Sequence, residues 1–159
     1  YNVPGRTAVD MANETTVRLA DIPNIIGIKD ATGDVARGTA LIQALAGKIH
    51  VYSGDDPTAY QLILAGAKGN ISVTANILPA QMAELCDLAA RGEASAAKEL
   101  NDSLMKVHDA MFVESNPIPV KYALERMGQM KSGIRLPMTR LSSAHHATLD
   151  SVMQSFGLI

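Results

Sequence analysis

The first half of the chain alternates short apolar runs with helical patterns. Three runs are rich in β-branched residues and are bounded by Gly, Asp or Asn, at residues 24–28, 49–52 and 69–73. Such runs are typical of buried parallel strands. Helical patterns over residues 35–45 and 57–67 lie between them. Strand–helix alternation predicts a parallel sheet with right-handed crossovers, and therefore an α/β fold.

The strand patterns stop after about residue 79, and helical patterns take their place. They cover residues 81–91, 94–113, 119–127 and 142–156. In the first half of the chain, a further short helix is expected at residues 13–20. We therefore expect two domains, a strand–helix domain at residues 1–78 and a helical domain at residues 79–159. Three clear strands and a strand end at residues 1–3 are too few to close a barrel, which needs eight.

Composition narrows the classes of function. The chain has 159 residues, 47% of them hydrophobic and 19% charged, with a formal net charge of −2. This balance favours a globular core and argues against nucleic acid or an anionic membrane as the main partner. No apolar run is long enough to span a bilayer. The chain begins at Tyr1 and enters a motif at once, so we expect that the protein begins earlier.

Cys86 is the only cysteine, so no internal disulfide can form. It lies among apolar residues at helical spacing, which favours a buried structural thiol over a nucleophile. We expect a reducing, cytoplasmic location.

Lys29 is the strongest candidate for chemistry. It follows the apolar run 24–28, so it lies at the C-terminal end of an expected parallel strand, where active sites of α/β proteins form. Burial there disfavours the ammonium form and frees the amine to attack a carbonyl group. The alternative is a lysine that marks the strand end and points to solvent.

Other polar residues also stand at strand ends. Arg6 would suit bidentate binding of a carboxylate, and Tyr1 could relay a proton, but the pair could equally be a turn with one surface arginine. Gly54 allows a ligand to approach the backbone. For Asp30, a structural role is as plausible as a catalytic one.

Neither a metal nor a nucleotide is expected. Asp55 and Asp56 have no histidine nearby in sequence, and Asp56 before Pro57 is more simply a helix cap. The four histidines, at positions 50, 108, 145 and 146, have no partners at metal-binding spacing and are interpreted as structural or surface residues. Glycine-rich phosphate motifs are absent.

An ordered set of motifs goes further than composition and spacing. It consists of YNVPGRT (1–7), GIKDATG (27–33), SGDD (53–56), NISVTAN (70–76), NPIPVK (116–121) and RLPM (135–138). Along its whole length the chain resembles the dihydrodipicolinate synthase family, within the N-acetylneuraminate lyase superfamily. The resemblance implies the second half of a (β/α)₈ barrel followed by a C-terminal α-helical domain. Tyr1 would then lie near the end of the fifth strand.

The resemblance also implies an activity. Members of this family condense pyruvate with L-aspartate-4-semialdehyde to 4-hydroxy-tetrahydrodipicolinate, on the route to diaminopimelate and lysine. Lys29 would form a covalent imine with pyruvate, so no metal or organic cofactor is expected. Tyr1 would belong to a proton relay, and Arg6 would hold the semialdehyde carboxylate. Backbone groups of Gly54 and Ile71 would line the pyruvate site.

Two alternatives remain. The chain could come from another pyruvate-dependent aldolase of the superfamily, although N-acetylneuraminate lyases differ in the loop that carries Arg6. It could also be a non-catalytic half-barrel whose sheet is completed by itself or by a partner. The family's relay threonine, second tyrosine, carboxylate-binding loop and lysine feedback site lie in its first half, so the chain alone is expected to be incomplete. For the full protein the resemblance implies a homotetramer, arranged as a dimer of dimers.

Overall fold

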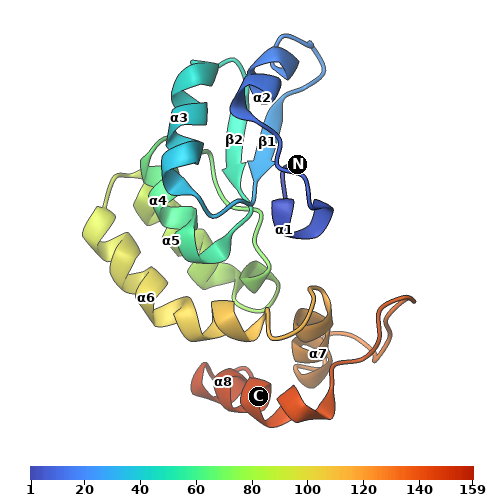
Figure 1. Cartoon of the computed structure of the whole chain (residues 1–159). Coiled ribbons are helices and arrows are strands. Elements are labelled where there is room, and N and C mark those ends of the chain that lie inside the picture. Colours follow the sequence, from blue (N-terminus) through green and yellow to red (C-terminus); the bar gives the residue numbers. More distant parts are fainter. The chain divides into compact units, whose positions relative to one another are not determined.

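A computed structural model describes all 159 residues, coloured along the chain in Figure 1. The chain divides into two compact units, one of residues 1–72 with 83–101 and the other of residues 73–82 with 102–159. The expected domain boundary between residues 78 and 79 stays a prediction. None of the helices has the length and apolar character needed to cross a membrane.

The first unit is built on parallel strand pairing. Strands β1 (Gly27–Asp30) and β2 (His50–Ser53) are parallel, with Gly27 opposite His50 and Asp30 opposite Ser53. Parallel bridges add Asn2 beside Asp30 on one side and Asn70 beside Ser53 on the other. Four segments therefore lie side by side, and the predicted parallel α/β arrangement is confirmed.

Two of the predicted strands have other bounds in the structure than the sequence indicated. The run at 69–73 forms only the bridge at Asn70, because the chain bends at Val73 and enters the 3-10 helix η2 (Thr74–Asn76). The run at 24–28 contributes only its last two residues to β1, which continues through Lys29 and Asp30. Ile26 is 78% exposed, so the apolar character of this run does not reflect burial throughout.

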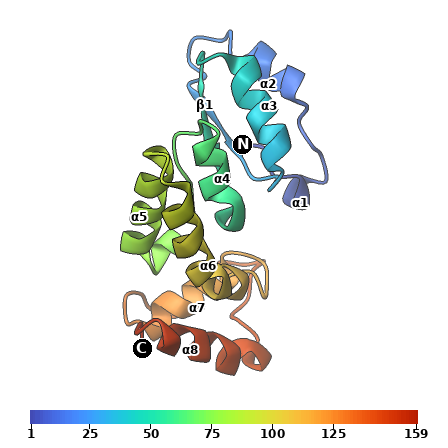
Figure 2. The same cartoon turned by 90° about the vertical axis from the view of Figure 1, so that its left-hand side faces the viewer.

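Short helices surround these strands. They are α1 (Pro4–Thr7), α2 (Asn13–Leu19), α3 (Val35–Leu45), η1 (Asp56–Thr58) and α4 (Ala59–Leu64). The bounds of α3 are those expected, and Asp34 caps it by accepting a hydrogen bond from the Arg37 N–H at 2.9 Å. Helix α3 packs beside α2 and α4, as Figure 2 shows. A Cβ atom on Gly38 would lie 2.5 Å from Leu62 Cδ1, so this glycine permits the close approach of α3 and α4.

Longer helices dominate the rest of the chain. Helices α5 (Pro79–Ala90) and α6 (Ala94–Ala110) each contribute residues to both units, whereas α7 (Ile118–Arg126), η3 (Ser143–His145) and α8 (His146–Ser155) belong to the second. All four helices predicted after residue 79 are present, with ends shifted by up to a few residues. In the second unit, Thr74 Oγ1 and His108 Nδ1 lie 2.8 Å apart in a buried hydrogen bond, which agrees with a structural interpretation of His108.

The core consists mainly of Leu, Ile, Val, Met and Ala side chains. Fully buried members include Leu41, Leu45 and Leu85 in the first unit, and Leu104, Leu149 and Met153 in the second. Cys86 is half-buried in α5, and burial raises the pKa of its thiol. A thiol with a raised pKa is a poor nucleophile at neutral pH, which supports the structural interpretation of Cys86.

Candidate functional site

Lys29 is the third of the four residues of β1, opposite Tyr52 of β2. The sequence predicted a strand that ends just before Lys29, but β1 continues to Asp30, two residues further than expected. Its carbonyl oxygen accepts a hydrogen bond from Asn2 N–H at 2.9 Å, and its side chain is half-buried. The expected position near the C-terminal end of a parallel strand is confirmed.

Tyr1 lies against the Lys29 side chain. Lys29 Nζ is 4.4 Å from the centre of the Tyr1 ring, within the range of a cation–π attraction. Backbone pairing produces this contact, because Asn2 N–H donates to Lys29 O and Ala31 N–H donates to Asn2 O, each at 2.9 Å. Tyr1 is still 61% exposed. The structure thus brings together two of the residues that the sequence singled out.

Gly54 supplies the space that Lys29 occupies. A Cβ atom at this position would lie 2.5 Å from Lys29 Cε and 2.8 Å from Ala31 Cβ, both too close to be tolerated. Its N–H donates to Asp30 O at 2.7 Å, which fixes the end of β2 beside the end of β1. Any side chain here would displace the lysine.

Arg6 and Ile71 lie on segments that pair with the C-terminal ends of β1 and β2. Ile71 follows the bridge residue Asn70, donates its N–H to Ser53 O at 2.9 Å and leaves half of its surface exposed. Arg6 lies in the single turn of α1, four residues after Asn2, and is exposed. Asn2 and Asn70 pair with the last residues of β1 and β2, so both candidates come from segments that reach these strand ends.

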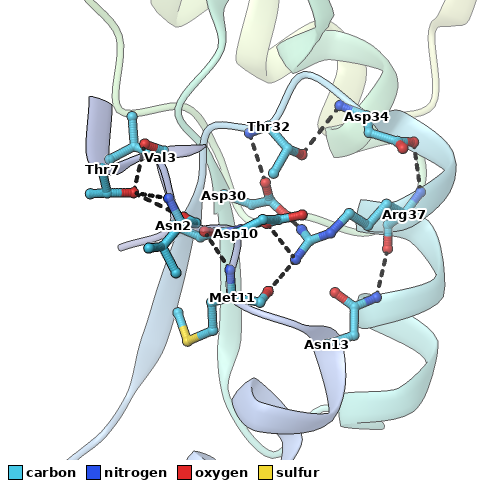
Figure 3. A network of polar contacts seen from close by, with 11 residues as sticks. Asn2, Val3, Thr7, Asp10, Met11, Asn13, Asp30, Thr32, Asp34 and Arg37 are labelled. Atoms are coloured by element: carbon cyan, nitrogen blue, oxygen red, sulfur yellow. Dashed lines mark hydrogen bonds and ion pairs between the residues drawn. The ribbon is translucent and has the colours of Figure 1, made fainter. Parts of the chain in front are cut away.

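Asp30 is held in a buried ion pair. It is 3% exposed, and its Oδ2 accepts a hydrogen bond from Arg37 Nη1 at 2.7 Å. Its Oδ1 accepts the Thr32 N–H at 2.9 Å (Figure 3). Because both carboxylate oxygens are engaged, this geometry supports the structural role for Asp30.

Arg37 and Asn2 were not anticipated. Arg37 Nη2 donates to Met11 O and lies 3.4 Å from Asp10 Oδ1. Asn2 reaches the same segment, since its Nδ2 donates to Asp10 Oδ1 at 2.7 Å and its Oδ1 accepts Met11 N–H at 3.1 Å. The one available signal was Asp30 itself, because a carboxylate buried at a strand end requires a cation nearby.

The acidic pair after β2 is engaged locally. Asp56 Oδ1 accepts a hydrogen bond from Asn70 Nδ2, and Asp55 Oδ2 accepts one from Thr58 Oγ1, both at 2.7 Å. Asp55 therefore supports the start of η1, while Asp56 ties the Asn70 segment to the end of β2. No group of three or more His, Cys, Asp or Glu side chains is arranged to hold a metal ion.

Comparison with known families identifies the chain. Residues 1–156 match the model described as the dihydrodipicolinate synthetase family. The chain belongs to that family. The resemblance inferred from the ordered motifs is thereby confirmed.

Curated relatives of the family are closely similar. Over 159 residues the chain is 58% identical to the 4-hydroxy-tetrahydrodipicolinate synthase of Marinobacter nauticus and covers 54% of that protein. It is 55% identical to the protein of the same name from Pseudomonas aeruginosa, again covering 54% of it. The chain spans about half the length of the relatives that it matches.

Solved structures share the fold. The chloride-inhibited dihydrodipicolinate synthase of Acinetobacter baumannii, complexed with pyruvate, is 57% identical and superposes with a TM-score of 0.97 over all of this chain and 55% of that one. The Thermotoga maritima dihydrodipicolinate synthase is 38% identical, with a TM-score of 0.94 over all of this chain and 54% of that one. The chain therefore has the α/β fold found in this part of dihydrodipicolinate synthases.

Proposed function

We propose that this chain is the second half of a (β/α)₈ barrel with its C-terminal helical domain. It would belong to a lyase that condenses pyruvate with L-aspartate-4-semialdehyde to 4-hydroxy-tetrahydrodipicolinate. The observation that carries the proposal is the position of Lys29 near a strand end, against the Tyr1 ring and in the space left by Gly54. Relatives of that activity name, with 54% of their length covered at 55–58% identity, support it.

Lys29 is the nucleophile. Its deprotonated amine attacks the ketone carbon of pyruvate and water leaves, which forms an imine. The imine acts as an electron sink, so a methyl proton of pyruvate can be removed to give an enamine. The enamine carbon attacks the aldehyde carbon of the second substrate, which regenerates the imine, and the aldehyde oxygen takes up a proton to become the hydroxyl group of the product. The amino group of that substrate then displaces Lys29 from the imine carbon, which closes the ring and frees the enzyme.

The neighbouring residues serve this sequence. Tyr1 relays protons during imine formation and ring closure, and its contact with the Lys29 side chain supports this role. Arg6 pairs with the carboxylate of the semialdehyde. Backbone groups of Gly54 and Ile71 line the pyruvate site. The imine supplies the electron sink, so the reaction needs no metal and no organic cofactor.

The parent protein, meaning the polypeptide that contains this chain and the rest of the barrel, is the catalytic species in this proposal. Its subunits assemble as a homotetramer in the cytoplasm. The alternatives are another pyruvate-dependent aldolase and a non-catalytic half-barrel. They differ in the aldehyde that the parent uses and in whether turnover occurs at all.

The test is turnover of pyruvate with L-aspartate-4-semialdehyde by the parent protein and by Lys29→Arg. Arginine keeps the charge but cannot form the imine, so we expect a loss of roughly a thousandfold or more in kcat. Normal turnover by Lys29→Arg would exclude the imine mechanism. A higher kcat/KM with an aldehyde that lacks the carboxylate would favour the other aldolases.

A further inference from the structure

The segment that carries Arg6 is closed into a ring by side chains. Asn2 pairs through its backbone with β1, and its side chain reaches forward to Asp10 and Met11 (Figure 3). Arg37 contacts the same two residues from α3 while its Nη1 holds Asp30 in β1. Helix α1, which carries Arg6, lies within this ring, between Asn2 and Asp10 along the chain.

The two ends of this segment, at Asn2 and at residues 9–11, are held by different kinds of hydrogen bond. Near Lys29, backbone hydrogen bonds join Asn2 to β1. At the far end, the backbone N–H groups of Val9 and Met11 donate to side chains, Thr7 Oγ1 and Asn2 Oδ1. The link from this end to α3 is made by the Arg37 guanidinium.

From this difference, and on the basis of the function proposed above, we propose that Arg37 is a positioning residue for Arg6. Arg37 ties Asp10 and Met11, at the far end of the segment, to α3 and thereby sets the place of the guanidinium that receives the carboxylate of the aldehyde substrate. Lys29 and Tyr1 stay in place without Arg37, because backbone pairing holds them. Arg37 thus acts on the second substrate and leaves imine formation with pyruvate almost unchanged.

Three variants separate this role from general stability. Arg37→Met removes the link from Asp10 and Met11 to α3 but leaves Asp30 buried without its cation, which destabilises the fold. The double variant Arg37→Met with Asp30→Asn removes both charges, and an asparagine oxygen can still accept the Thr32 N–H. Arg37→Lys keeps a charge for Asp30, but an ammonium on a single stem cannot also reproduce the fork that reaches Met11.

The first readout uses the parent protein and does not depend on catalysis. Trypsin cleaves after Arg6, and cleavage requires the segment to open locally. In all three variants we expect cleavage after Arg6 to accelerate about fivefold, while cleavage after the exposed Lys131 changes by less than about twofold. Unchanged cleavage after Arg6 would overturn the inference.

The second readout is the kinetics of the parent protein. We expect the KM for the semialdehyde to rise roughly tenfold in the double variant, while the rate of borohydride-trapped pyruvate adduct on Lys29 stays within about twofold of the unsubstituted protein. An adduct rate that falls in step with the rise in KM would overturn the inference, and so would an unchanged KM.

Arg126→Met is the matched control. Arg126 makes two hydrogen bonds to Asp150 in the other unit, at 3.0 and 3.1 Å, so its loss also breaks an Arg–Asp pair. We expect Arg126→Met to leave both the cleavage after Arg6 and the semialdehyde KM unchanged. Changes as large as those of the Arg37 variants would overturn the inference. If the unsubstituted parent forms no pyruvate adduct, the proposed function fails by itself, and the tryptic readout still decides whether Arg37 holds the segment.

Discussion

The space around Lys29 is defined at the scale of single residues by a missing side chain and an aromatic ring. Gly54 leaves room for the methylene groups of the lysine, and the Tyr1 ring faces its Nζ at 4.4 Å. Backbone pairing sets both neighbours, through Asn2 beside β1 and the Gly54 N–H on Asp30 O. Small substitutions at these positions should therefore lower the reaction rate more than they lower the stability of the fold.

Gly54→Ala tests this arrangement. The added Cβ would lie 2.5 Å from Lys29 Cε, so the lysine side chain must move out of its place. We expect the rate of pyruvate adduct formation in the parent protein to fall by roughly a hundredfold. Gly133→Ala is the control, since a Cβ atom there meets nothing within 4 Å. Equal adduct rates in the two variants would contradict the assignment of the site.

Arg6→Ala tests the carboxylate-binding role. Arg6 is exposed in α1 and lies outside the strand pairing that holds Lys29, so its loss should leave the pyruvate step intact. We expect kcat/KM for the semialdehyde to fall roughly a hundredfold and the KM for pyruvate to change less than about threefold. Steady-state kinetics with each substrate varied in turn measures both. Equal losses for both substrates would count against this role.

At the scale of elements, the second unit shows how helices are joined by charge. Tyr122 and Arg126 of α7 both donate to the Asp150 carboxylate of α8, and the Tyr122 ring stacks on His146 with centres 4.6 Å apart. Burial acts to raise the pKa of Asp150, but the hydrogen bonds from Arg126 and Tyr122 outweigh it and lower this pKa below its ordinary value. The ionised carboxylate therefore stabilises the α7–α8 pair.

Asp150→Asn should show this in the pH dependence of stability. A carboxyl group with a lowered pKa in the folded state stabilises the fold above its unfolded-state pKa, and that contribution is lost as the pH falls through the folded-state value. We expect a lower Tm for the variant at pH 7 and a difference that closes below about pH 4. Thermal melts of both proteins across this range measure it. A difference that stays constant to low pH would exclude the ion pair as its cause.

Local patterns in the sequence predicted the elements well. Helix α3 has its expected bounds because an acidic cap and regular apolar spacing coincide there. Helix α1 was not predicted, because Pro4 and Gly5 are typical of turns and a turn was one of the two interpretations left open for this segment. The strand predicted at residues 69–73 forms only one bridge, because the chain leaves the sheet after Ile71.

The site was predicted only in part. Lys29, Tyr1 and Gly54 were singled out because they stand in motifs at strand ends, and the structure brings these three candidates together. The ring of Asn2, Asp10 and Arg37 was missed because its contacts join residues up to 27 positions apart, and local periodicity carries no information about such pairs. The ion pair of Asp30 depends on how α3 returns beside β1, which only the folded chain reveals.

At the scale of the whole molecule, the chain contains four parallel segments and spans about half the length of its relatives. Parallel pairing that stops at Asn2 and Asn70 leaves strand edges in the isolated chain. Apolar side chains are exposed in the same unit, including Val9, Ile22, Ile26 and Ile71. Open edges beside exposed apolar residues favour association with another polypeptide.

The isolated 159-residue chain should therefore self-associate. We expect light scattering to show a mass that rises with concentration, and we expect the parent protein to give a single tetrameric mass. The comparison needs both polypeptides in the same buffer. A stable monomer of the isolated chain at high concentration would contradict this account of its edges, and a defined dimer of half-length chains would favour the non-catalytic alternative.

The proposed mechanism requires that Lys29 form an imine with pyruvate. The most direct measurement is an intact mass spectrum of the parent protein after incubation with pyruvate and borohydride, followed by peptide mapping. We expect one reduced pyruvate adduct, located on Lys29 and absent in Lys29→Arg. A full-length parent that forms no adduct, or forms it at another lysine, would contradict the claim.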